Sequence, residues 1–148
     1  MSMASDILKL YEGVIVPFSP EFEIDFADFC IIIQNQQNDL KETLENLKGI
    51  YAIVDKSNHK KYIGSASSNK GGIWLRWLDY ANNGYGDSIE LEKLLKKNDG
   101  IEYAKQHFRF WLLEPHSMEV DDTVIRDRES YWKDYWLTRN TLFGYNSN

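Results

Sequence analysis

The alternation of apolar and polar residues predicts a β-hairpin near the middle of the chain. Residues 49–54 form a short β-prone run, residues 55–60 are polar and turn-like, and residues 61–64 are β-prone again. Because side chains on a strand alternate between its two faces, such a hairpin can bring Tyr51 and Tyr62 together on one face. Taken alone, two tyrosines on neighbouring strands indicate a cross-strand packing pair.

Helical periodicity dominates the sequence after the hairpin. Apolar residues recur at helical spacing in three segments, and a β-prone run precedes the last of them. We therefore expect helices at about residues 72–82, 88–97 and 120–137, and a third strand at about residues 108–113. The expected order from residue 49 onwards is strand, strand, helix, helix, strand, helix.

The first 48 residues carry a mixed pattern. It consists of an amphipathic start, two short β-prone pieces, an apolar run and a polar helix, at residues 7–11, 14–18, 22–24, 29–33 and 37–47. We expect residues 1–48 to form an acidic N-terminal extension that packs on a module formed by residues 49–148.

Length and composition limit the class of protein. At 148 residues the chain is long enough for one ordinary domain with a real core. Cys30 is its single cysteine, which excludes an internal disulfide and a thiolate metal site within one chain. The start of the chain lacks the apolar core of a signal peptide, and no apolar run is long enough to span a membrane. We expect a soluble, cytoplasmic protein without a membrane partner.

The net charge of −6 lies in the N-terminal part. Residues 1–48 hold three Lys and nine Asp or Glu, whereas residues 49–148 hold equal numbers of basic and acidic residues. Lysines lie in and beside the hairpin turn and on the second predicted helix, at Lys56, Lys60, Lys61, Lys93, Lys96 and Lys97. These lysines can neutralise phosphates or simply face solvent.

On the first predicted helix, five apolar residues cover one broad arc, at Trp74, Leu75, Trp77, Leu78 and Ala81. Arg76 and Tyr80, four residues apart, are expected together on the other side. We expect Trp74 and Trp77 in the core, and Arg76 either facing a ligand or lying on the surface.

On the last predicted helix, Glu129 is expected at the margin of an apolar stripe. Ile125, Trp132 and Trp136 lie at i−4, i+3 and i+7 from it. A carboxylate near apolar rings is unfavourable unless it is paired or binds a metal. Pairing with Lys133 or Arg126 and metal binding are both open at this point.

Five ordered blocks resemble the GIY-YIG nuclease family. They are Gly49-Ile50-Tyr51, Tyr62-Ile63-Gly64-Ser65-Ala66, Gly72-Ile73-Trp74-Leu75-Arg76-Trp77, Arg128-Glu129-Ser130-Tyr131-Trp132 and Gly144-Tyr145-Asn146. The resemblance covers residues 49–148. It implies an α+β fold, with a small antiparallel three-stranded sheet flanked by helices, and metal-dependent cleavage of phosphodiester bonds.

The resemblance also implies roles for the charged residues. Glu129 would hold one Mg²⁺ or Mn²⁺ ion, because a carboxylate oxygen suits a hard divalent cation that takes its other ligands from water and phosphate. Arg76 would bind the non-bridging phosphate oxygens as a permanently charged fork. Asn146 would form hydrogen bonds within the site.

Three tyrosines complete the implied site. Tyr51 would be the general base or would position the attacking water, with Tyr62 as a hydrogen-bonding partner. Tyr80 stands where many relatives carry His and others Tyr, and would be a supporting donor. A free phenol has a pKa near 10, so we expect cationic charge from the metal and Arg76 to favour the phenolate of Tyr51.

The function expected from the resemblance is that of an endonuclease acting on DNA. An alternative of a different class is a non-catalytic module that binds nucleic acid or protein with the same fold. The negative net charge of the whole chain favours this alternative. A third interpretation is a catalytic chain whose DNA affinity comes from a partner protein or domain.

Overall fold

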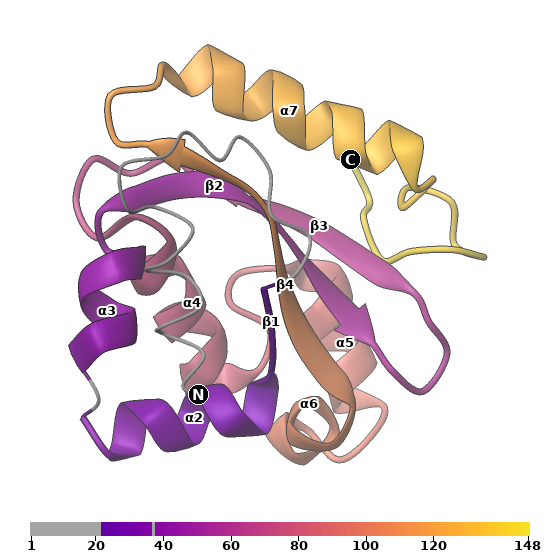
Figure 1. Ribbon diagram of the computed structural model, residues 1–148. Helices are drawn as coiled ribbons and strands as arrows, with labels where there is room; N and C mark the ends of the chain where they lie inside the picture. Colours follow the sequence, from indigo (N-terminus) through magenta and orange to yellow (C-terminus); the bar gives the residue numbers. More distant parts are fainter. Residues whose placement is uncertain (1–21, 37) are drawn as a thin grey trace.

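A computed structural model describes residues 22–36 and 38–148 (Figure 1). In chain order its elements are β1 (Glu23–Asp25), α2 (Phe26–Gln34), α3 (Asn38–Leu44), β2 (Leu47–Asp55), β3 (Lys61–Ala66), α4 (Gly72–Asn83), α5 (Ile89–Lys96), α6 (Ile101–His107), β4 (Phe108–Ser117) and α7 (Asp122–Tyr135). The amphipathic start and the β-prone piece at residues 14–18, both predicted from the sequence, lie outside the described residues.

The predicted α+β class is confirmed, but the described sheet has four strands where three were expected. Its order is β1-β4-β2-β3, and every neighbouring pair is antiparallel. The additional strand, β1, pairs with β4 over only three residues. Arg109 of β4 fixes this pairing, because its Nε and Nη1 donate to Glu23 and Asp25 at 3.1 and 2.8 Å.

The predicted hairpin is confirmed. Residues 55–60 connect β2 to β3, and the backbone N–H of Asp55 donates to the carbonyl of Lys60 at 2.9 Å. Tyr51 pairs with Gly64 and Ile53 pairs with Tyr62. Since directly opposed residues share a face, both tyrosines point to the same side of the sheet.

The sheet separates two cores. Figure 1 shows α7 lying along one face, with the other helices on the opposite side. The larger core, on the side of α4, contains Phe29, Tyr51, Trp77, Tyr80 and Phe110, with Trp77 stacked on Phe110 at 4.5 Å between ring centroids. The smaller core lies under α7 and is formed by Ile50, Ala52, Ile63, Leu113, Ile125 and Trp132.

Helix α4 corrects one expectation from the sequence. Trp74 and Trp77 are buried as predicted, but the predicted arc is wrong for two residues, because Tyr80 is fully buried and Leu75 is 49% exposed. The helix packs through Ile73, Trp77 and Tyr80, at i, i+4 and i+7. Tyr80 belongs to this face because its hydroxyl group finds a partner inside the core.

Residues 22–36 and 38–48 belong to the same sheet and core as the rest. They supply β1, α2 and α3, and buried side chains such as Phe26, Phe29 and Leu44. The predicted boundary at residue 48 lies within β2. The division into an N-terminal extension and a module of residues 49–148 stays a prediction. Among the described residues, no helix has the length and apolar character to cross a membrane.

Candidate active site

Tyr51 and Tyr80 form a buried pair of phenols. Their hydroxyl oxygens lie 2.8 Å apart, and neither residue has exposed surface. The ring of Tyr51 lies against Gly64, where an added Cβ would come within 2.6 Å of its Cζ and Oη. Trp77 packs edge-on against Tyr51 at 5.9 Å. The glycine of the second sequence block therefore makes room for the tyrosine of the first.

Burial sets the protonation state of these phenols. It raises the pKa of Tyr51, and the positive charge of Arg76 opposes that increase without cancelling it. Burial also raises the pKa of Tyr80, with the neighbouring Tyr51 as a second cause. The sequence led us to expect that cationic charge would favour the phenolate of Tyr51, but within these residues desolvation is the larger effect.

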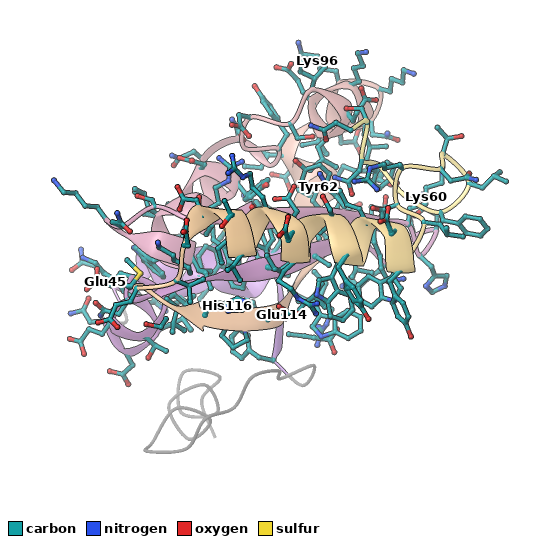
Figure 2. All side chains as sticks on the ribbon, turned by 90° about the horizontal axis from the view of Figure 1, so that it is seen from above. Glu45, Lys60, Tyr62, Lys96, Glu114 and His116 are labelled. Atoms are coloured by element: carbon teal, nitrogen blue, oxygen red, sulfur yellow. The ribbon has the colours of Figure 1, made fainter. Side chains whose placement is uncertain are left out.

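Tyr62 is the phenol of the hairpin that reaches the surface. It is partly buried and lies diagonally across the hairpin from Tyr51. Burial raises its pKa, Arg76 lowers it and Glu129 raises it. The opposite effects of Arg76 and Glu129 indicate that this phenol lies within electrostatic range of both. Figure 2 shows Tyr62 on one side of α7, with Glu114 and His116 on the other.

Arg76 projects from α4 beside the tyrosine pair. Its guanidinium carbon lies 6.0 Å from the centre of the Tyr80 ring. Nη2 and Nη1 donate to the two carboxylate oxygens of Asp87 at 2.9 and 3.3 Å. Nε is buried and has no hydrogen-bond partner among the residues that the structure describes. The guanidinium of Arg76 thus presents the two donors expected from the sequence, and the carboxylate of Asp87 occupies both of them.

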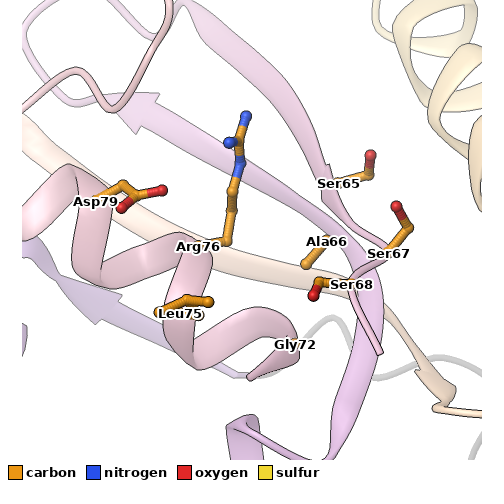
Figure 3. Close-up of a pocket in the computed structure, with 8 residues that line it drawn as sticks. All are labelled: Ser65, Ala66, Ser67, Ser68, Gly72, Leu75, Arg76 and Asp79. Carbon is orange, nitrogen blue, oxygen red and sulfur yellow. The ribbon is translucent and has the colours of Figure 1, made fainter. Parts of the chain in front are cut away.

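An open groove lies between the end of β3 and the start of α4 (Figure 3). Its volume is about 360 Å³, and its lining residues are Ser65, Ala66, Ser67, Ser68, Gly72, Leu75, Arg76 and Asp79. Arg76 supplies positive charge to the groove, and the serines supply hydroxyl groups. This combination can bind an anion such as a phosphate.

Glu129 is connected to the same groove through Ser65, from the opposite face of the sheet. The hydroxyl group of Ser65 donates to Oε1 of Glu129, and Nζ of Lys133 lies 2.7 Å from Oε2. Ser65 shares the α7 face with Ile63, whereas Tyr62 and Gly64 share the α4 face. Arg76 and Glu129 therefore lie on opposite sides of β3, the edge strand of the described sheet.

The donor set at Glu129 fits one hard divalent cation. A carboxylate and the Ser65 hydroxyl group are oxygen donors, and Mg²⁺ commonly takes one or two carboxylates with water and phosphate. No group of three or more His, Cys, Asp or Glu in the described part of the chain could hold an ion. Lys133, one of the two pairing partners considered from the sequence, occupies Oε2 and would have to give way.

Asn146 fastens the C-terminal segment to the edge strand. Its side-chain oxygen accepts from the backbone N–H of Ile63 at 2.8 Å, and its amide group donates to the carbonyl of Ile63 at 3.0 Å. Gly144 forms a bridge with Lys61 nearby. The backbone N–H and carbonyl groups of Ile63, which precedes Gly64, are therefore both hydrogen-bonded on the open edge of β3. In this arrangement Asn146 supports β3 from outside.

The sequence analysis missed Asp87, Ser65 and Glu114 as partners of the predicted residues. The carboxylate of Glu114 accepts hydrogen bonds from Arg128 and from Nε1 of Trp132, the latter at 3.0 Å. It also lies 2.9 Å from Nε2 of His116. Burial raises the pKa of Glu114, but its hydrogen bonds lower it further, so the net shift is downward. Glu114 fixes α7 on β4 and so sets the position of Glu129. Arg128, next to Glu129 in the sequence block, was the one signal for Glu114, because an arginine beside an apolar stripe needs an acidic partner.

The lysines considered from the sequence are held by neighbours to different degrees. Lys60 and Lys61 lie over the rings of Tyr145 and Trp136, at 5.6 and 5.2 Å. Lys56 pairs with Asp25 at 3.1 Å. Lys93 and Lys96 are paired within α5, with Glu90 and Glu92 at 4.0 and 3.6 Å. Lys60 directly precedes β3 and Lys61 begins it, and both can contact a phosphate backbone.

Comparison with known proteins gives one structural similarity. The fold is similar to that of a mutant form of the catalytic domain of intron endonuclease I-TevI. The two share 24% sequence identity at a TM-score of 0.49, over 69% of this chain and 94% of that domain. No protein-family model matches the chain. No curated protein matches the sequence either. At this level of similarity, the functional interpretation depends on the residues of the site.

Proposed function

We propose that this protein is an endonuclease of the GIY-YIG type that hydrolyses phosphodiester bonds of DNA with one divalent cation, Mg²⁺ or Mn²⁺. The observation that supports it is the placement of Arg76 and Glu129 at the two sides of β3, with Tyr62 in electrostatic range of both. Hydrolysis of a phosphodiester needs positive charge at the non-bridging oxygens, a positioned water and stabilisation of the departing 3′ oxygen.

Arg76 would bind the scissile phosphate. Its two Nη groups already hold two carboxylate oxygens in a fork, which is the geometry that two non-bridging phosphate oxygens require. The groove beside it is open to a ligand and lined by three serines. Arg76 would thereby neutralise charge on the pentacoordinate phosphorus.

Glu129 would hold the cation, with Ser65 orienting its carboxylate. A bound Mg²⁺ supplies a Lewis acid that stabilises charge on the phosphate and on the leaving oxygen. Lys133 pairs with the carboxylate in the absence of the ion and would compete with it. Glu114 and Arg128 hold α7, and with it Glu129, against β4.

The tyrosines would position and activate the attacking water. The buried hydroxyl group of Tyr51 and its bond to Tyr80 favour a positioning role beside Arg76. The partial exposure of Tyr62 supports a contact between this phenol and the attacking water. Tyr51 then acts as a general base only if loading of the site opens its hydroxyl group to that water. Asn146 would keep β3 in place.

A non-catalytic interaction module is the second candidate function. Its support is that Arg76 and Glu129 are both paired internally, with Asp87 and Lys133, as charges of purely structural importance would be. The net charge of −6 also opposes strong DNA binding by the chain alone. A nuclease with this charge would rely on a partner protein or domain for DNA affinity.

Cleavage of supercoiled plasmid in Mg²⁺ and in EDTA tests the proposal. Linear duplex, single-stranded and branched DNA complete the substrate panel. We expect nicking by the wild type in Mg²⁺ only, and a loss of at least about 100-fold in Glu129→Gln and Arg76→Met. Glu92→Gln is the matched control, because Glu92 also pairs with a Lys at i+4 but lies on α5. Full activity in Glu129→Gln would overturn the proposal, and binding without cleavage would favour the interaction module.

A further inference from the structure

We propose that Asp87 occupies the place of a substrate phosphate on Arg76 and must leave it before a phosphodiester can bind. This inference rests on the function proposed above for the phosphate-binding role of Arg76. The carboxylate presents two oxygens to the two Nη groups, at 2.9 and 3.3 Å. Two non-bridging oxygens of a phosphate would use the same two donors, so both anions cannot occupy the fork together.

The loop that carries Asp87 is fixed by its neighbours. The side-chain oxygen of Asn83 accepts from the backbone N–H groups of Tyr85 and Gly86, at 2.9 and 2.7 Å. Gly86 has a φ of +60° and packs so closely on the Tyr80 ring that an added Cβ would lie 2.8 Å from it. Ser88 then caps α5 by accepting from the N–H of Leu91 at 3.2 Å. The backbone at Asp87 is therefore placed by the same core that places Arg76.

The side chain of Asp87 is largely exposed to solvent although its backbone is held. Its exposed fraction is 71%, whereas that of Arg76 is 31%. Rotation of the carboxylate into solvent would release the guanidinium without moving α4 or α5. An exposed ion pair of this kind is weak, so an anion that binds the groove at several points can replace it.

The pair with Asp87 does not use every hydrogen-bond donor of Arg76. Nε is buried without a hydrogen-bond partner among the described residues, while both Nη groups point at the exposed carboxylate. Asp79, one turn along α4, adds a second negative charge to the groove. Asp87 thus blocks the two Nη groups directly, whereas Asp79 adds only a solvent-screened charge to the groove. A DNA backbone that also contacts the serines would compensate for the loss of the Arg76–Asp87 pair.

The experiment must distinguish direct competition of Asp87 for Arg76 from a general effect of negative charge at the groove. Asp87→Asn removes the competitor of the phosphate together with one negative charge. Asp79→Asn removes one negative charge from the same groove and leaves the Arg76–Asp87 pair in place. Binding of a fluorescent DNA duplex in EDTA, where no cleavage is expected, is measured by anisotropy for both variants, for Arg76→Met and for Asp87→Asn in the Arg76→Met background.

The expected result is a dissociation constant about tenfold lower in Asp87→Asn, because a free bidentate guanidinium gains a charge-assisted pair. Asp79→Asn should change it less than about twofold, as a single screened charge does. In the Arg76→Met background Asp87→Asn should have no effect beyond that of Asp79→Asn. Equal effects of Asp87→Asn and Asp79→Asn, or an unchanged effect of Asp87→Asn without Arg76, would overturn the inference.

A second measurement does not depend on nuclease function. Inorganic phosphate is titrated into ¹⁵N-labelled protein, and the Nε–Hε resonance of Arg76 is followed by NMR. We expect saturable shifts at lower phosphate concentration in Asp87→Asn than in the wild type or Asp79→Asn. If no DNA is bound or cut but this difference is found, the proposed function fails and the displacement by Asp87 stands. If the titrations coincide, the inference fails, whatever the cleavage assay shows.

Discussion

Tyr51 of β2 lies directly opposite Gly64 of β3, and its phenol ring fills the volume that a side chain at position 64 would occupy. This contact links two sequence blocks that are separated by the hairpin turn. It places the hydroxyl group of Tyr51 against Tyr80 on α4, and Arg76 lies one turn before Tyr80 on the same helix. Gly64, which lacks a side chain, therefore helps to set the position of Arg76 through Tyr51 and Tyr80.

Substitution of Gly64 by Ala should damage both stability and the site. The new Cβ would lie 2.6 Å from Cζ and Oη of Tyr51, so the ring must shift away from Tyr80. We expect a loss of about 2 kcal/mol in the free energy of unfolding, measured by urea denaturation. Gly100→Ala is the control, because its Cβ would meet no described atom within 4 Å and only its φ of +63° is strained. A cost for Gly64→Ala no greater than that for Gly100→Ala would contradict the packing described here.

The phenol pair should behave as a coupled unit. Tyr51→Phe or Tyr80→Phe leaves the other hydroxyl group buried without its 2.8 Å partner, at a cost of about 1–3 kcal/mol. The double variant removes both polar groups together and should cost less than the two single variants combined. Thermal and urea unfolding of the four proteins measure this cycle. Strict additivity would show that the two hydroxyl groups do not bond to each other.

Lys133 should set the concentration of metal that the site requires. Because its Nζ lies 2.7 Å from Oε2 of Glu129, a bound cation must displace it. Replacement by Met keeps most of the buried side-chain volume and removes the competing charge. We expect the Mn²⁺ dissociation constant, measured by electron paramagnetic resonance of free Mn²⁺, to fall about tenfold.

Lys96→Met provides the comparison for Lys133→Met. Lys96 also pairs with a Glu four residues earlier, but its side chain is 75% exposed on α5. Mn²⁺ affinity should be unchanged in this variant and absent in Glu129→Gln. A wild-type affinity in Lys133→Met would mean that Lys133 and the cation do not share Glu129.

Acid should weaken the protein through Asp55. This buried carboxylate accepts from the hydroxyl groups of Ser57, Tyr103 and Tyr145, at 2.6, 2.6 and 2.7 Å. Burial raises its pKa, but these hydrogen bonds lower it further, to below the ordinary value of 3.8. A lowered pKa in the folded state stabilises the protein above the unfolded-state value, and this contribution is lost as the pH falls through the folded-state value.

The measurement is the free energy of unfolding between about pH 5 and pH 2. Wild type should lose stability over this range, mostly below the unfolded-state pKa of Asp55. Asp55→Asn should be less stable at pH 5 and should lose less on acidification. The exposed substitution Asp79→Asn should follow the wild type. Identical pH profiles for Asp55→Asn and wild type would exclude Asp55 as an acid-sensitive group.

The sequence predicted those features that depend on local patterns. Strand alternation placed Tyr51 and Tyr62 on one face, and the register confirms it. Helical periodicity located α4, α5 and α7 to within a few residues and placed Trp74 and Trp77 in the core. Glu129 lies at the margin of its apolar stripe, where a carboxylate needs partners, and it has two of them.

Features that depend on contacts distant in the sequence were not predicted. Strand β1 falls on the β-prone piece expected at residues 22–24, but its place in the sheet was not predicted, because Arg109, more than eighty residues later, fixes its pairing. Helix α6, which was not expected, has seven residues and a single fully buried side chain, Ala104, so its periodic signal is weak. Tyr80 was expected outside the core because helical periodicity does not reveal that Tyr51 on β2 is the partner of its hydroxyl group. Asp87 was missed for the same reason.

The central claim is that Arg76 and Glu129 form one phosphate and metal site across β3. It is tested most directly by the anomalous difference density of a crystal soaked with Mn²⁺ and a deoxynucleoside 3′,5′-bisphosphate. The account predicts Mn²⁺ at about 2.1 Å from a carboxylate oxygen of Glu129, with a phosphate group between the ion and Arg76. Manganese and phosphate bound elsewhere, with Arg76 still on Asp87 and Glu129 still on Lys133, would contradict it.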